Sequence, residues 1–88
     1  MNNSVEARLR EEADHCYQWS NGAGAVYAVH DHPYRKILYV AKGSITFTPP
    51  GRSPIEMRAG DRIDLPAGTA HGAVVGPEGV TCWEGQAK

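Results

Sequence analysis

Residues 24–43, GAVYAVHDHPYRKILYVAKG, decide how the rest of the chain is interpreted. The run is strand-like, and it carries His30 and His32 one residue apart. Side chains two positions apart on a strand point to the same face of a sheet. The two imidazoles are therefore predicted to project side by side from one wall, as the ligands of a metal site on a sheet would. Pro33 interrupts the hydrogen-bonding ladder and marks an edge or a bulge directly after them.

Short strand-like segments recur about every ten residues along the chain, with turn residues between them. The predicted segments are 17–20, 25–29, 37–41, 44–48, 55–58, 63–65, 71–75 and 80–84. Turns are expected between them, including one at Lys42-Gly43 and one over residues 76–79. This pattern is typical of an antiparallel sandwich or barrel.

A short helix is predicted before the strands, because Val5, Leu9 and Ala13 recur at every fourth position. Such a narrow apolar stripe favours a helix that packs on the outside of a sheet. His15 follows it and is interpreted as a surface residue. We therefore expect an all-β fold in one domain over residues 1–88, with a helical segment at 1–15 and the barrel at 17–84.

Composition excludes several classes of function. The 88 residues carry a net charge of −1 with no basic stripe, which argues against binding to nucleic acid. The apolar runs are too short to span a bilayer, and the polar residues after Met1 do not resemble a secretory signal. Cys16 and Cys82 make no disulfide framework, so we expect reduced thiols and a cytoplasmic location, with a redox pair or a reactive thiol as the open alternative. Because so small a core is marginal, a homodimer is expected.

Two sets of spaced residues resemble the motifs of the cupin family. The first motif is Gly, five residues, His-x-His, three or four residues, Glu, six residues and Gly. It is matched by Gly24, His30, His32 and Gly43, with Lys36 at the glutamate position. The second motif is Gly, five residues, Pro-x-Gly, two residues, His, three residues and Asn. It is matched by Gly60, Pro66, Gly68 and His71, with Val75 at the asparagine position.

The resemblance implies a small β-barrel of jelly-roll type, with His30, His32 and His71 as metal ligands in its mouth. Three neutral imidazoles suit a divalent transition metal such as Fe, Zn, Mn, Ni or Cu. Three protein ligands also leave positions open for water or substrate, which suits catalysis better than a closed structural site. The alternative is that the histidines hydrogen-bond one another and water without a metal.

Lys36 complicates the metal interpretation, because it stands where the resemblance implies a negatively charged ligand. An ammonium about 5 Å from a dication is opposed by about 7 kcal/mol at an effective dielectric constant of about 20. Three arrangements would relieve this: the head reaches water or a nearby acid, the amine loses its proton, or the metal is absent and Lys36 binds an anion. The structural alternative is a partly exposed strand lysine paired with an acid.

Further residues are candidates for the wall of the predicted pocket. Val75 in place of asparagine makes the predicted pocket more apolar. Tyr34, Phe47, Met57 and Trp83 could line it, although Phe47 and Met57 are interpreted as plain core. Asp31 alternates with the histidines and is expected to face solvent.

Three functions are compatible with these residues. The first is a metal-dependent enzyme of oxygenase or isomerase type that acts on a small molecule, which in one version is an anion. Lys36 or Tyr34 would then orient the anion or move a proton. The second is a non-catalytic module that binds or senses a small molecule, metal-free because Lys36 replaces the usual glutamate. The third is a storage or scaffold role for a stable dimer with a vestigial site.

Overall fold

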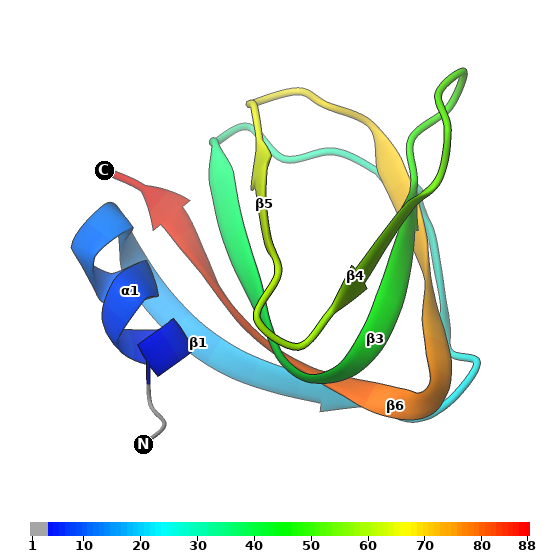
Figure 1. The fold of residues 1–88 in the computed structure, drawn as a ribbon. Coiled ribbons are helices and arrows are strands. Elements are labelled where there is room, and N and C mark those ends of the chain that lie inside the picture. The colour runs from blue at the N-terminus through cyan, green and yellow to red at the C-terminus, as the bar shows by residue number, and fades with distance from the viewer. Residues whose placement is uncertain (1–3) are drawn as a thin grey trace.

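A computed structural model describes residues 4–88 (Figure 1), so the first three positions of the predicted helical segment lie outside the described residues. The elements are α1 (Ser4–Glu12), β1 (Ala13–Asn21), β2 (Val26–His30), β3 (Lys36–Thr48), β4 (Ile55–Arg58), β5 (Arg62–Leu65) and β6 (His71–Ala87). The prediction of an all-β fold with a short N-terminal helix is confirmed. The helix ends at Glu12 rather than at residue 15, and the first strand begins directly at Ala13.

The strands form one antiparallel sheet built around two long members, β3 and β6. The order along the sheet is β1-β6-β3-β4, with β2 also paired to β6 and β5 also paired to β3. Figure 1 shows the sheet curling around its interior, with α1 outside it beside β1 and the C-terminal end of β6. Among the described residues the hydrogen-bonded strands do not close into a ring, so the fold is a curled jelly-roll type rather than the closed barrel that the sequence suggested.

The predicted turns at 42–43 and 76–79 are wrong, because the chain bends there without reversing. β3 runs unbroken for 13 residues and β6 for 17, with register shifts between Val40 and Ile45 on β3. Gly43 and Gly79 adopt φ of +77° and +80° at these bends, conformations that glycine alone adopts readily. A Cβ on Gly43 would lie 2.0 Å from the Gly79 carbonyl oxygen, so the two bends lie in direct contact.

Period-two alternation along β3 separates the two hydrophobic clusters. Leu38 and Val40 point inward, into a core shared with residues of β4 and β6. Ile37 and Tyr39 point to the other face, where they meet Leu9 and Ala13 from the helical end of the chain. The predicted helix stripe is therefore confirmed as the contact between α1 and the outside of the sheet. Both faces of β3 are buried at this point, which anchors the strand that carries Lys36.

Two further features of the fold bear on the predictions. His15 is exposed and has φ of +56°, at the register shift between Asp14 and Tyr17 where β1 bulges away from β6. It is the surface residue that the sequence suggested. Across residues 4–88, no helix combines the length and the apolar character needed to cross a membrane.

Candidate metal centre

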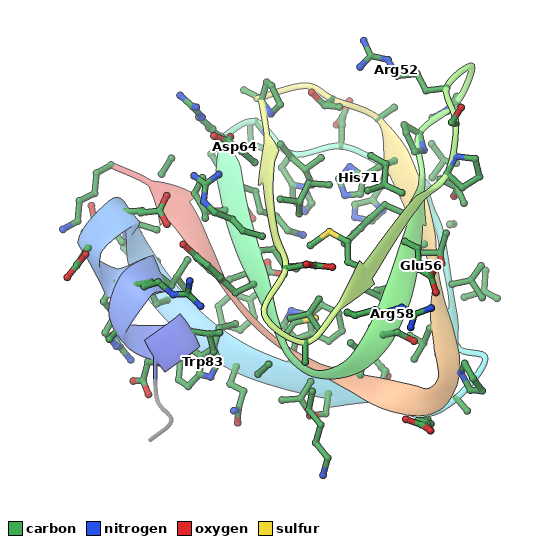
Figure 2. The ribbon with its side chains drawn as sticks, viewed as in Figure 1. Arg52, Glu56, Arg58, Asp64, His71 and Trp83 are labelled. Atoms are coloured by element: carbon green, nitrogen blue, oxygen red, sulfur yellow. The ribbon has the colours of Figure 1, made fainter. Side chains whose placement is uncertain are left out.

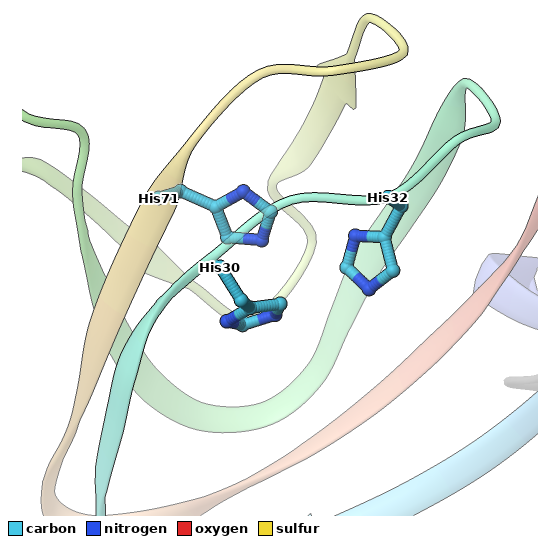
Figure 3. A group of neighbouring side chains, drawn as sticks. All are labelled: His30, His32 and His71. Atoms are coloured by element: carbon cyan, nitrogen blue, oxygen red, sulfur yellow. The ribbon is translucent and has the colours of Figure 1, made fainter.

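Three histidines from two distant parts of the chain meet inside the curled sheet. His30 is the last residue of β2, His71 is the first residue of β6, and the two pair directly across the strands. His32 follows β2 outside any strand, so the prediction that both early histidines lie on a strand holds only for His30. Figure 3 shows the three rings gathered between these segments. Ring centroids lie 4.6 Å (His30–His71), 5.0 Å (His30–His32) and 5.5 Å (His32–His71) apart.

The ring nitrogens of this triad have the spacing of a metal-binding cluster. One nitrogen from each ring lies within 4.8 Å of the others. Burial is graded across the site: His30 is exposed, His32 is intermediate and His71 is only 2% exposed. Figure 2 shows His71 within the curled sheet, whereas Glu56 and Arg58 are exposed side chains of β4. The site is thus open on one side and enclosed on the other.

Backbone carbonyls fix the orientation of two of the rings. Nδ1 of His71 lies 2.9 Å from the Thr69 carbonyl oxygen, and Nδ1 of His30 lies 2.7 Å from the Ala28 carbonyl oxygen. A carbonyl only accepts, so each Nδ1 must carry the proton, which leaves the Nε2 lone pair free to coordinate. Nε2 of His71 is buried and has no hydrogen-bond partner in the described structure. A buried acceptor without a partner is costly, and a metal ion would satisfy it.

The surroundings favour the neutral imidazoles that metal binding requires. Burial lowers the pKa of His32, and the positive charges of Lys36 and the other histidines lower it further. Burial is also the main reason that the pKa of His71 is lowered, ahead of the charge of Lys36, although the hydrogen bond to Thr69 opposes it. In both cases Glu84 acts in the opposite direction to Lys36.

Lys36 lines the same cavity as the triad. It is buried, and so it differs from the partly exposed strand lysine that the sequence offered as an alternative. It is 7% exposed, and its Nζ lies 3.2 Å from Oε1 of Glu84 on β6. Glu84 accepts two further hydrogen bonds from β1, one from the Tyr17 hydroxyl at 2.7 Å and one from Trp19 Nε1 at 2.8 Å. Of the arrangements considered from the sequence, the ammonium paired with a nearby acid is the one found.

The cavity has a volume of about 350 Å³ and mixes polar and apolar walls. Its lining comprises Tyr17, Trp19, Asn21, Tyr27, His30, His32, Lys36, Ile45, Phe47, His71, Ala73 and Glu84. Phe47 belongs both to this wall and to the core, with its ring 6.0 Å from that of His71.

Several side chains considered for the pocket lie elsewhere. Val75 and Met57 belong to the hydrophobic core, so the apolar pocket wall predicted from Val75 is not found. Trp83 lies on the helix side of the sheet, under the Arg10 guanidinium. Tyr34 is not among the lining residues, but its ring packs 5.2 Å from that of His32. Asp31 is exposed, as predicted.

Sequence reasoning missed Glu84, Tyr17 and Trp19 as members of the site. A signal for Glu84 was present, because it is in phase with Val80 and Cys82, and all three are buried on the inward face of β6. An acid at an inward position of an apolar strand indicates a buried polar partner. Tyr17 and Trp19 carry no comparable signal, because aromatic residues with polar tips occur equally on open surfaces.

Comparisons with known proteins match this architecture. The sequence profile of the cupin domain matches residues 19–82. An RmlC-like cupin from Shewanella frigidimarina is 28% identical with a TM-score of 0.69, over 78% of this chain and 60% of that one. The polyketide cyclase RemF from Streptomyces resistomycificus is 26% identical with a TM-score of 0.71, over 78% and 50%. KdgF from Halomonas sp. is 25% identical with a TM-score of 0.69, over 83% and 67%.

The chain therefore spans only part of the length of these structures. A search of curated proteins finds no significant match.

Proposed function

The chain belongs to the cupin-domain family, and on that premise we propose that it binds a divalent transition metal through His30, His32 and His71 and acts on a small molecule in the adjoining cavity. The observation that carries the proposal is the buried Nε2 of His71, which has no partner in the described structure and belongs to the converging triad. When bound, such a metal supplies Lewis-acid or redox chemistry at its open positions. The metal could be Fe, Zn, Mn, Ni or Cu.

The protein's own residues have distinct roles in this proposal. The Thr69 and Ala28 carbonyls hold the rings of His71 and His30 so that Nε2 faces the centre. Lys36 keeps donor capacity beyond its pair with Glu84, since an ammonium has three N–H groups. It can therefore donate to an anionic oxygen of a ligand in the cavity. Tyr34 packs against His32 and would orient that ring or a ligand at the open side.

A non-catalytic binding or sensing module is the second candidate, and a specific observation favours it. The Lys36 ammonium lines the same cavity as the triad, where a metal-free site could hold a small anion directly. The two candidates differ in what the small molecule contacts. In the enzyme a ligand atom reaches the metal, whereas in the metal-free module the ligand binds equally well without one.

Cobalt(II) substitution tests the choice, because the visible absorption of cobalt(II) reports its ligands. Metal-free protein would be titrated with cobalt(II) and then with small carboxylic acids. The enzyme proposal predicts a cobalt spectrum that depends on His71 and shifts when an acid enters an open position. Acid binding that is identical with and without cobalt, and that leaves the spectrum unchanged, would instead support the metal-free module.

Association and location complete the proposal. We expect a cytoplasmic homodimer, supported by two free cysteines and by exposed valines at one edge of the sheet. Val26 and Val74 are paired across β2 and β6 and are 72% and 41% exposed. Within residues 4–88, β2 pairs with β6 alone, which leaves its other edge open to a second strand. Sedimentation equilibrium would give the mass in solution, and a concentration-independent monomer would contradict the dimer.

A further inference from the structure

We propose that Glu84 is a positioning residue for the metal centre. By pairing with the Lys36 ammonium in the same cavity, Glu84 compensates a positive charge that would otherwise oppose the binding of a metal ion. The carboxylate comes from β6 and the ammonium from the first residue of β3. The inference rests on the proposed metal-binding function, because without a metal the compensation of charge would have no ligand to serve.

The geometry shows that Glu84 is held rigidly for this role. Its carboxylate receives donors from two strands: Nζ of Lys36 on β3, and the Tyr17 hydroxyl and Trp19 Nε1 on β1. Side-chain exposure is 8% for Lys36 and 5% for Glu84, so water competes little for either charge. A charge-assisted bond in such surroundings is strong and directional. The ammonium is therefore held at the carboxylate.

Electrostatics gives this pairing a consequence for metal binding. Lys36, Glu84 and the three histidines all line one cavity. An unpaired ammonium there would repel a dication, whereas the paired ammonium and carboxylate together carry no net charge. Lys36 thus stands at the glutamate position of the first motif, and Glu84 supplies a carboxylate to the cavity from the last strand. Glu84 acts through Lys36, not as a ligand.

The test compares metal affinity in four variants of the full chain by calorimetric titration of metal-free protein with zinc(II). Glu84→Gln should weaken zinc binding by about tenfold or more, because the Lys36 charge is then uncompensated. The double variant Glu84→Gln/Lys36→Met should return to within about twofold of the wild type, because both charges are gone. Glu56→Gln is the matched control, since it removes an exposed carboxylate paired with Arg58 on β4, and it should leave the affinity unchanged.

Lys36→Met alone keeps the proposal testable if Glu84→Gln does not fold. It leaves the Glu84 carboxylate without its ammonium, so zinc should bind more tightly than to the wild type. Unchanged or weaker binding by Lys36→Met would overturn the proposal. So would a Glu84→Gln variant with wild-type affinity, or a double variant as weak as Glu84→Gln.

Failure of the proposed function itself would look different. A wild-type protein that binds no zinc, or binds it equally well after His71→Ala, would remove the metal centre. A wild type that binds zinc through His71, but is indifferent to Glu84, would leave the metal centre intact and remove only this inference.

Discussion

Replacing Gly43 with alanine should destabilise the fold strongly, although the glycine is only half-buried. Gly43 bends β3 at φ of +77°, and its position opposite Val80 brings it against the bend of β6. A Cβ built there lies 2.0 Å from the Gly79 carbonyl oxygen and 2.9 Å from its carbonyl carbon. Both atoms belong to the backbone, so they cannot rotate away as a flexible side chain would. The paired strands β3 and β6 would have to separate at this point.

The magnitude has two parts. An alanine in the left-handed region costs roughly 1–2 kcal/mol, offset by about 0.4–1 kcal/mol because the unfolded chain loses entropy. Forcing an extra carbon into a packed contact adds about 1–3 kcal/mol. We therefore expect the free energy of unfolding to fall by about 1–5 kcal/mol, a large share of the roughly 5–15 kcal/mol of a typical domain.

Gly51 supplies the matched control for this substitution. It has a similar φ of +74°, but a Cβ there meets no atom within 4 Å. Gly51→Ala should therefore show the backbone strain alone, about 1 kcal/mol or less. Urea unfolding followed by circular dichroism would measure both variants. Equal losses of stability at the two positions would refute a close-packed contact between the bends at Gly43 and Gly79.

Two further predictions concern charge and thiol chemistry. Hydrogen bonds from Arg62 and Tyr39 lower the pKa of Glu12, so its contribution to stability is present above the unfolded pKa and is lost as pH falls through the folded one. Glu12→Gln should thus lower the free energy of unfolding by about 1 kcal/mol at neutral pH and not at all in strong acid, and a deficit independent of pH would contradict this. Burial raises the pKa of the Cys82 thiol to about 12, whereas Cys16 is half-buried. An Ellman titration of the folded protein at pH 8 should therefore label Cys16 alone, and rapid labelling of both thiols would show that Cys82 is accessible.

The sequence predicted the family and the histidine triad because both depend on residues at fixed spacing. His30, His32 and His71 match the two motifs, and the curled sheet brings them together although His32 lies outside the strand. The helical spacing of Val5, Leu9 and Ala13 was equally informative for the packing of α1, where Leu9 is fully buried. These features could be predicted because they depend on the spacing of side chains along the chain, and not on whether the chain turns or continues at a given glycine.

The bends in β3 and β6 and the pairing of Lys36 with Glu84 could not be predicted from the sequence. Gly43 and Gly79 indicate positive φ, but that conformation fits a turn and a bend within a continuous strand equally well. Only the pairing between β3 and β6 on both sides of the bend decides between them. The partner of Lys36 lies 48 positions away, at Glu84, and no local pattern links the two.

The most direct test of the proposed metal centre is the metal content of protein purified without an affinity tag, for the wild type and for His71→Ala. His71 has the most buried ring of the triad, and its unpaired Nε2 is the observation on which the centre depends. We expect a stoichiometric divalent transition metal in the wild type and its loss from a folded His71→Ala variant. A wild type without metal, or a variant that retains it in full, would show that the three histidines do not form a metal site.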